Sequence, residues 1–308
     1  MNENIIKEFQ KLVYQIKVDI RKKNNPIDKY RLGSVQNVLR LLKQIDFRIT
    51  DSDELKGIKG IGKKSLDRVQ EILDTGKLSE ININTKKEFI KNEIIKIFGI
   101  GNQSIDEIIK KHKIKSVDDF IKKVKSKKIK VNDQVKLGVK YYKHSIKKIP
   151  RSEITEGKTK LKKILKGFYV EICGSYRRKK KESNDIDVLV YHPKKSLSDV
   201  IELLYKHKFL LDDLTENSNT KYMGYCKIKK TPRRIDIRMV TKEQIPYALL
   251  YFTGSKNFNK HMRQVAKAQG YKLNEYGLYK NNKLIKLKSE RQIFRKLGLR
   301  YTPPKDRE

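Results

Sequence analysis

The stretch Asp185-Ile186-Asp187-Val188-Leu189-Val190 joins two carboxylates to a run of branched apolar residues, which is typical of a β-strand. Side chains two residues apart in a strand point to the same side of the sheet. Asp185 and Asp187 are therefore expected to face one site, while Ile186 faces the core. Since surface strands also carry alternating acids, the pair alone leaves a purely structural interpretation open.

A third carboxylate lies in a second strand-like segment. Asp236 is the central residue of Arg234-Ile235-Asp236-Ile237-Arg238, in which polar and apolar side chains alternate. Three carboxylates at one site repel one another unless cations neutralise them. Mg²⁺ prefers oxygen ligands and accompanies phosphoryl chemistry, so the three aspartates predict a magnesium site.

Two further motifs flank the aspartates. Upstream, a glycine, a hydroxyl and two arginines follow an apolar run, in Gly174-Ser175-Tyr176-Arg177-Arg178. These groups could bind a phosphate. Downstream, Tyr251-Phe252-Thr253-Gly254 sets two aromatic rings on a glycine turn, and Asn259 follows. Aromatic faces pack on a sugar or base, and an amide hydrogen-bonds a base edge. Together these motifs predict a nucleotidyltransferase that uses a nucleoside triphosphate.

The N-terminal half contains a repeated glycine turn. Ile58-Lys59-Gly60-Ile61-Gly62 and Phe98-Gly99-Ile100-Gly101 each open a helical pattern, and the two copies lie 39 residues apart. Glycines permit a tight turn with positive φ, and the free amides at the following helix start suit a phosphate. We interpret both as helix-hairpin-helix elements that grip the DNA backbone without reading bases. Plain helix-turn-helix packing is the alternative.

The predicted secondary structure changes near the middle of the chain. Helical periodicity covers segments such as 3–20 and 32–45, whereas β-rich runs occur at 169–173, 186–191, 222–228 and 235–240 around a helical stretch at 197–206. Ile149-Pro150-Arg151 is the candidate boundary. The C-terminal Pro303-Pro304-Lys305-Asp306-Arg307 is expected to be exposed.

Composition limits the class of protein. The 308 residues include 74 Lys or Arg against 36 Asp or Glu, which gives a formal charge of +38. Such an excess indicates a polyanionic partner, most simply nucleic acid, with an anionic membrane surface as the second choice. Two cysteines make no disulfide framework, and no apolar run approaches the roughly 20 residues of a spanning helix. The basic runs 122–130 and 177–181 are either solvated faces or DNA contacts.

At these motifs the chain resembles the family X DNA polymerases of the beta type. Lys221-Tyr222-Met223-Gly224, Asn274-Glu275-Tyr276 and Pro304-Lys305-Asp306-Arg307 match as well, so the resemblance runs from about residue 29 to the C-terminus. It implies an α+β multidomain fold. The implied parts are an all-α helix-hairpin-helix domain (1–83), a helical DNA-binding subdomain (84–147), a catalytic palm (148–241) and a nucleotide-binding subdomain (242–308).

The resemblance also implies a role for each matching residue. Asp185 and Asp187 would hold two Mg²⁺ ions, with Mn²⁺ as a substitute, and Asp236 would hold the catalytic one beside Arg234. The implied nucleotide-binding residues are Ser175, Arg178, Ser183, Asn184, Tyr251, Phe252, Gly254 and Asn259. Tyr251 and Phe252 would crowd the sugar and disfavour a ribose.

DNA contacts are implied in the same way. They are Lys29, Gly60, Gly62, Lys63, Lys64, Gly99, Gly101 and Arg263, of which Lys29 and Lys64 match contacts to a 5′-phosphate and Arg263 a contact to the template. Each hairpin would bind Na⁺ or K⁺ through backbone carbonyls. The implied carbonyl ligands are those of Lys56, Ile58, Ile61, Ile95, Ile97 and Ile100.

The chain departs from the family pattern in its first domain. Where the family has a Schiff-base lysine that removes a 5′-deoxyribose phosphate, this chain has Arg68, which cannot form the imine. Gly33 replaces the assisting tyrosine and Asp28 replaces a histidine. Lyase activity is therefore doubtful, with Lys63 or Lys64 as the candidate replacements.

These observations lead to one hypothesis and two alternatives. The chain is expected to be a monomeric, intracellular polymerase that takes dNTPs and fills gapped or nicked duplex DNA in base excision repair. A DNA ligase and an AP endonuclease would act in the same pathway, in a nucleus or in a viral factory or virion, and no membrane is involved. The alternatives are a template-independent terminal nucleotidyltransferase and a non-catalytic DNA-binding protein.

Overall fold

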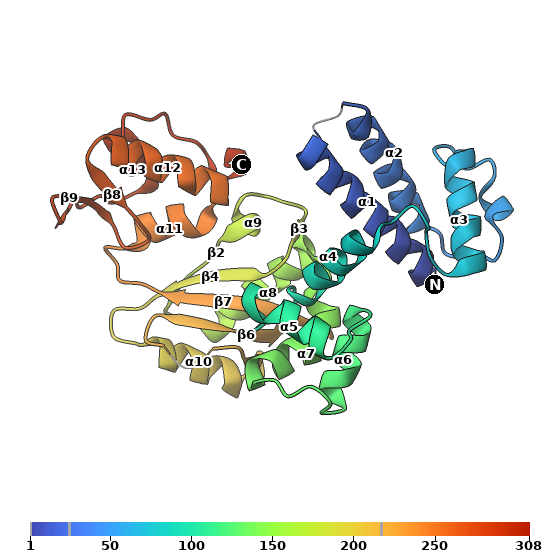
Figure 1. The fold of residues 1–308 in the computed structure, drawn as a ribbon. Coiled ribbons are helices and arrows are strands. Elements are labelled where there is room, and N and C mark those ends of the chain that lie inside the picture. Colours follow the sequence, from blue (N-terminus) through green and yellow to red (C-terminus); the bar gives the residue numbers. More distant parts are fainter. Residues whose placement is uncertain (1, 24–25, 216–217) are drawn as a thin grey trace. The chain divides into compact units, whose positions relative to one another are not determined.

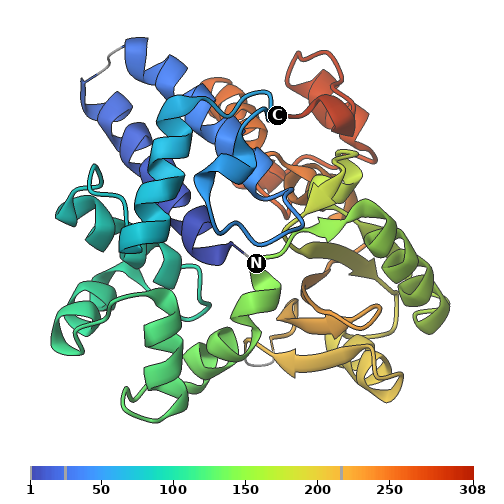
Figure 2. The same cartoon turned by 90° about the vertical axis from the view of Figure 1, so that its right-hand side faces the viewer.

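The computed structural model describes residues 2–23, 26–215 and 218–308. The chain divides into two compact units, Met1–Lys130 and Val131–Glu308. The first is helical, and the second combines a mixed sheet with helices (Figures 1 and 2). Within the described ranges, no helix is long and apolar enough to cross a membrane.

The first unit begins with a helical core. Helices α1 (Glu3–Lys23) and α2 (Pro26–Leu42) pack side by side, and η1 (Ser52–Leu55) and α3 (Lys63–Thr75) follow (Figure 2). Phe9 and Leu12 from α1, Val38 from α2 and Val69 and Ile72 from α3 are buried in one cluster. These residues recur at helical spacing, which is why the segments fold as amphipathic helices.

Three more helices complete the first unit. They are α4 (Ile83–Ile94), α5 (Asn102–Lys111) and α6 (Val117–Lys125). Asn82 and Ser116 cap α4 and α6 by accepting hydrogen bonds from backbone amides. Gly101 precedes α5 without a side-chain cap.

The second unit is organised around a five-stranded sheet in the order β2-β4-β7-β6-β5. These strands are β2 (Tyr169–Ile172), β4 (Ile186–Tyr191), β5 (Leu210–Asp213), β6 (Lys221–Lys227) and β7 (Pro232–Met239). Each of the four predicted β-rich runs overlaps one strand, although β6 and β7 begin one and three residues before their runs. Among the described strands of this sheet, β4 and β7 alone pair in parallel. Helices α8 (Arg151–Ile164) and α10 (Leu197–Lys206) contribute Ile154, Leu161, Val200 and Leu204 to the core of the sheet. Short elements β1 (Ile149–Pro150), α9 (Gly174–Arg177) and β3 (Glu182–Ser183) surround the start of β4.

Helix α7 (Asp133–Ser145) belongs to the second unit. Lys140 forms an ion pair with Asp212 at 2.8 Å, and the Tyr141 ring stacks on Tyr225 with centroids 3.9 Å apart. Ser145 Oγ and Tyr225 Oη are hydrogen-bonded at 2.7 Å. The compact units therefore divide at residue 130, within the predicted DNA-binding subdomain 84–147, and the four subdomain boundaries remain predictions.

The C-terminal part packs around a small core of its own. Its elements are α11 (Ile245–Thr253), α12 (Lys256–Ala268), β8 (Tyr271–Leu273), β9 (Leu278–Lys280), β10 (Lys283–Leu284), α13 (Glu290–Lys296) and η2 (Pro304–Asp306). Tyr247, Met262 and Phe294 are buried in this core. The expectation of an exposed C-terminal segment is wrong for Arg307, whose side chain is fully buried among aromatic rings and paired with a carboxylate.

Candidate active site

The parallel pairing of β4 and β7 brings the predicted aspartates together. Asp187 on β4 is the direct register partner of Asp236 on β7, and Asp185 immediately precedes β4. Ile186 is buried in the sheet core, as the alternation predicted. Main-chain hydrogen bonding thus places acidic residues from two distant segments side by side.

Arg234 lies between two of the carboxylates. Its Nη2 donates to Asp236 Oδ2 at 3.0 Å and lies 3.8 Å from Asp185 Oδ2. Burial alone disfavours the charged guanidinium, but Asp236 and Asp185 more than offset this and raise the Arg234 pKa. Arg234 therefore remains a cation and partly neutralises the acidic group.

The surroundings of Asp187 disfavour its charged form. Burial, with repulsion from Asp185 and Asp236, raises the pKa of Asp187 to about 7. Burial also raises the pKa of Asp185, against the attraction of Arg234. A carboxyl group whose pKa is raised in this way releases its proton when a cation binds beside it.

Gly174 makes room for this carboxylate. Its φ is +53°, and a Cβ added there would lie 1.9 Å from Asp187 Oδ2. Only a residue without a side chain fits both the left-handed backbone and the close approach. Asp187 and Asp236 line a pocket together with Arg238 and Phe252, whose ring lies 5.4 Å from the Arg238 guanidinium.

The aspartates fit divalent cations in their chemistry. Asp236 Oδ1 is buried and has no hydrogen-bond partner among the described residues. In that same part of the chain, no group of three His, Cys, Asp or Glu side chains is arranged to hold a metal ion. Mg²⁺ is commonly bound by one or two carboxylates with substrate phosphates and waters completing its shell, so an open set of hard oxygen donors is suitable.

The predicted triphosphate residues gather around α9. Ser175 Oγ donates to Ser183 Oγ at 2.7 Å, and the Arg178 guanidinium donates to the carbonyl of Thr253. Burial lowers the pKa of Arg178, and Asp187 partly counters that effect. Asn184 is exposed and accepts a hydrogen bond from Lys148 Nζ at 2.6 Å.

The predicted sugar and base residues lie on α11 and α12. Asn259 Nδ2 donates to the Tyr251 carbonyl at 2.6 Å, which joins the two helices. Tyr251, Asn259 and Arg263 line one pocket, whereas Phe252 lines the pocket of the aspartates. Gly254 has φ of +66°, and a Cβ there would lie 3.1 Å from Arg178 Nη1.

The two glycine turns adopt the same geometry. Ile61 N donates to Ile58 O at 3.0 Å, and Ile100 N donates to Ile97 O at 3.3 Å. The third residue of each turn has positive φ, +101° at Gly60 and +86° at Gly99. Gly62 and Gly101 then precede α3 and α5 without a side-chain cap, so no capping side chain occupies the first amides of either helix, which suits an anion.

The remaining hairpin predictions are only partly placed. Lys63 and Lys64 begin α3 and are exposed, whereas the side chain of Lys29 lies outside the described residues. The carbonyls of Ile58 and Ile97 accept the turn hydrogen bonds, and the Lys56 ammonium pairs with Asp53 at 2.6 Å. Ile95 directly follows α4, and its amide donates to the Lys91 carbonyl at 3.0 Å.

The residue at the family's lyase position is engaged in an ion-pair cluster. Arg68 Nε lies 2.5 Å from Glu80 Oε1, and Arg31 Nη2 lies 2.9 Å from Glu80 Oε2. The backbone of Glu80 is held in turn by Gln15, whose Nε2 donates to its carbonyl at 3.0 Å. Gly33, where the family has a tyrosine, borders open space.

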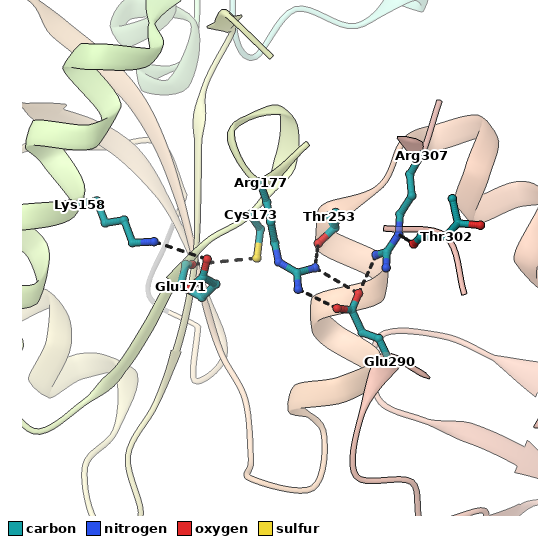
Figure 3. A network of polar contacts seen from close by, with 8 residues as sticks. All are labelled: Lys158, Glu171, Cys173, Arg177, Thr253, Glu290, Thr302 and Arg307. Atoms are coloured by element: carbon teal, nitrogen blue, oxygen red, sulfur yellow. Dashed lines mark hydrogen bonds and ion pairs between the residues drawn. The ribbon is translucent and has the colours of Figure 1, made fainter. Parts of the chain in front are cut away.

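The sequence did not reveal a second ionic cluster, centred on Glu290. Arg177 Nη2 lies 2.7 Å from Glu290 Oε2, and Arg307 Nη1 lies 2.6 Å from Glu290 Oε1 (Figure 3). Arg177 also donates to Thr253 Oγ1 at 2.6 Å. Arg177, the first residue of the basic run 177–181, is therefore a structural link between α9, α11 and α13. The one signal for it was the match of Pro304–Arg307 to the family.

Family models match three segments of the chain. They are a helix-hairpin-helix domain at residues 1–78, the DNA polymerase beta palm at 148–242 and the DNA polymerase beta thumb at 248–308. These matches contain the three aspartates and the first hairpin, whereas the second hairpin at 98–101 lies between the first and second matches.

Known proteins are similar over most of the chain. DNA polymerase lambda from Rattus norvegicus is 28% identical over 91% of this chain, and that from Arabidopsis thaliana is 27% identical over 100%. The chain spans 53% and 62% of the length of these two relatives.

Solved structures give the same result. A ternary P/T complex of Leishmania infantum polymerase beta is 30% identical with a TM-score of 0.67, and the match covers 72% of this chain and 99% of that one. A ternary gap complex of the same protein is 28% identical with a TM-score of 0.68, covering 80% and 96%. The polymerases that these comparisons match use divalent metal ions. This chain belongs to their family, the family X DNA polymerases.

Proposed function

We propose that the chain is a template-directed DNA polymerase that fills short gaps in duplex DNA. One observation carries the proposal: the register of β4 and β7 sets Asp187 beside Asp236, in a pocket that Phe252 also lines. The reaction is attack of the primer 3′-hydroxyl on the α-phosphate of a dNTP, with pyrophosphate leaving. We take gapped or nicked DNA as the substrate, because a similar solved structure is a gap complex and because two hairpins could hold a duplex at two points.

Each residue then has a defined task. Asp185 and Asp187 would hold two Mg²⁺ ions, or Mn²⁺, and Asp236 the catalytic one; bound there, they would neutralise the charge that develops on the reacting phosphate. Arg234 orients Asp236 by binding Oδ2 and leaves Oδ1 free toward the primer hydroxyl. Arg178, beside the two hydrogen-bonded serines of the α9 cradle, supplies the cation for the triphosphate.

The first unit would hold the DNA on either side of the gap. Each hairpin leads into a helix that has no side-chain cap, and these helix starts would bind phosphates, with Na⁺ or K⁺ bound at the turn carbonyls. Lys63 and Lys64, with Lys29, would bind a 5′-phosphate at the far side of the gap. We further propose that the enzyme acts as a monomer in base excision repair, after an AP endonuclease and before a DNA ligase. The compartment would be a nucleus, or a viral factory or virion.

The first domain is proposed to lack lyase chemistry at its usual position. An imine needs a neutral amine, whereas Arg68 stays protonated and is paired with Glu80. Borohydride trapping on DNA with a 5′-deoxyribose phosphate tests this. We expect no adduct; an adduct that disappears in a Lys63→Ala, Lys64→Ala variant would show that a neighbouring lysine has taken over.

The polymerase proposal is tested by single-nucleotide incorporation into a gapped duplex with Mg²⁺. Wild type should extend the primer, and Asp236→Ala should lose at least about a thousandfold in rate while binding the DNA normally. Asp133→Ala, an exposed aspartate on α7, is the matched control. Extension by Asp236→Ala would refute the assignment, and extension of single-stranded primer without template would favour a terminal transferase.

A further inference from the structure

The basic run at 122–130 is not accounted for by the hairpins or the active site. Lys122 and Lys125 lie on α6, and Lys127, Lys128 and Lys130 follow it; we call these five side chains the α6 lysine surface. All five are exposed, and none has an ion-pair partner among the residues that the structure describes. The surface is therefore uncompensated positive charge.

Nearby acids are already occupied. Asp119 pairs with Lys123 at 2.9 Å and accepts from the Lys115 amide at 2.9 Å, and Asp118 pairs with Lys7 at 2.7 Å. Residues 110–130 contain ten lysines and two aspartates, a formal +8 in 21 residues. The chain as a whole carries +38 in 308, so charge here is about three times denser than average, more than a uniform lysine bias explains.

The surface is built into an ordered turn. Lys127 N donates to Val124 O at 3.0 Å, Ile129 N donates to Lys123 O at 3.2 Å, and Ile129 is buried. Lys123 has a structural role. Besides pairing with Asp119, its ammonium donates to the His112 carbonyl at 3.0 Å, which joins α6 to the end of α5. Because the backbone of this turn is fixed, its lysines lose less freedom when they bind a partner than lysines on a loose tail.

Helix-dipole stabilisation does not account for the cluster. Cations in the last turn of a helix gain about 0.3–1 kcal/mol at the surface, and the effect fades beyond that turn. Lys128 and Lys130 lie past the end of α6. Five uncompensated lysines repel one another, so their accumulation points to an external polyanion.

We propose that the α6 lysine surface binds the phosphate backbone of duplex DNA beyond the contact of the second hairpin. That hairpin opens α5, whose ten residues span roughly 15 Å, and Lys123 holds α6 against the far end of α5. A duplex gripped at the hairpin has further phosphates about every 3.4 Å of its axis on each strand. The proposal rests on the proposed function in taking DNA as the partner.

The test is the salt dependence of binding to a gapped duplex, measured by fluorescence anisotropy. The variant replaces Lys122, Lys125, Lys128 and Lys130 by Gln and keeps Lys127, whose positive φ would confound the result. The slope of the logarithm of the binding constant against the logarithm of the salt concentration becomes shallower by about 0.9 for each lost phosphate contact. We therefore expect the steepness of this slope to decrease by about 2 to 4 in the variant, and its binding to be at least tenfold weaker near 0.15 M salt. The rate of incorporation at saturating DNA should not change.

The control replaces Lys162, Lys163, Lys166 and Lys206, four exposed lysines on or next to α8 and α10, by Gln. It removes the same charge and should leave the slope within about 1 of wild type. An unchanged slope in the α6 variant, or an equal decrease in the control, would overturn the proposal. So would phosphatidylserine vesicles that bind wild type but not the α6 variant while DNA binding is unaffected. If the slope falls as expected but wild type incorporates no nucleotide, the surface stands and the proposed polymerase function fails.

Discussion

The raised pKa of Asp187 lowers the stability of the folded protein near neutral pH. Its pKa is raised to about 7 in the fold, against about 3.9 for an unfolded aspartate. A raised carboxyl pKa means that the folded state prefers the protonated form. The resulting destabilisation is absent below the unfolded pKa, grows as pH rises, and is complete above the folded pKa.

Asp187→Asn should therefore stabilise the protein in the absence of divalent cations. We expect an increase of a few kcal/mol in the free energy of unfolding at pH 8, at about 1.4 kcal/mol per unit of pKa shift, and a much smaller one at pH 4. Urea unfolding in EDTA between these pH values measures it. Asp133→Asn, on the exposed start of α7, should change little, and a destabilised Asp187→Asn at pH 8 would contradict the electrostatic account.

Lys208 illustrates backbone strain at a helix end. It follows α10 with φ of +53°, and its amide donates to the Tyr205 carbonyl at 2.8 Å. Left-handed backbone costs an L-residue roughly 1 kcal/mol, so Lys208→Gly should stabilise the protein by up to about that amount in chemical denaturation. Lys206→Gly, at the end of the same helix but in helical conformation, should destabilise by about 0.5–1 kcal/mol. The same sign for both variants would argue against backbone strain.

At the residue scale, alternation predicted which side chains of β4 and β7 face the site, because strand periodicity is fixed by covalent geometry. Alternation could not predict that Gly174 contacts Asp187 or that Arg234 reaches two aspartates. Those contacts depend on register and on backbone torsion, which a single sequence does not display.

At the scale of elements, the Glu290 cluster joins α9 to α13. Burial raises the pKa of Glu290, but hydrogen bonds and charge from Arg177 and Arg307 outweigh burial and leave it below the ordinary value. A lowered pKa stabilises the fold above the unfolded pKa of about 4.3, and this stability is lost as pH falls through the folded pKa.

Glu290→Gln should thus destabilise the protein by about 3–5 kcal/mol at pH 7, because two arginines are left without their carboxylate, and the difference should narrow below about pH 4. Thermal unfolding across this range tests it. Glu308→Gln removes the exposed partner of Lys180 and should stay within about 0.5 kcal/mol. A pH-independent difference would mean that the cluster acts through packing alone.

The hairpins were predictable at this scale and the Glu290 cluster was not. Glycines at fixed spacing before a helix leave a local signature, and the turns have the expected positive φ. Arg177, Glu290 and Arg307 lie far apart in sequence, and surface and buried arginines look alike in a basic chain. Only tertiary packing distinguishes them.

At the scale of the whole molecule, the first unit is expected to recognise the end of a gap. Lys63→Gln with Lys64→Gln should reduce the preference for a 5′-phosphate over a 5′-hydroxyl at the gap by about tenfold, because charge-assisted contacts to phosphate are lost. Extension on an open template should be unaffected. Competition between the two gapped substrates measures this.

The matched control is Lys43→Gln with Lys77→Gln, two exposed lysines of the same unit. An equal loss of preference in the control would mean that overall charge, not the hairpin, reads the phosphate. The division of the chain at residue 130 lies outside what sequence could predict, because α7 is assigned to the second unit by its contacts with β5 and β6 rather than by its place in the chain.

The register of β4 and β7 has a consequence for divergence. Asp187 and Asp236 are neighbours through main-chain pairing, which places these two positions side by side whenever the strands pair in this register. Substitutions and length changes in the connection between the strands leave the pair in place.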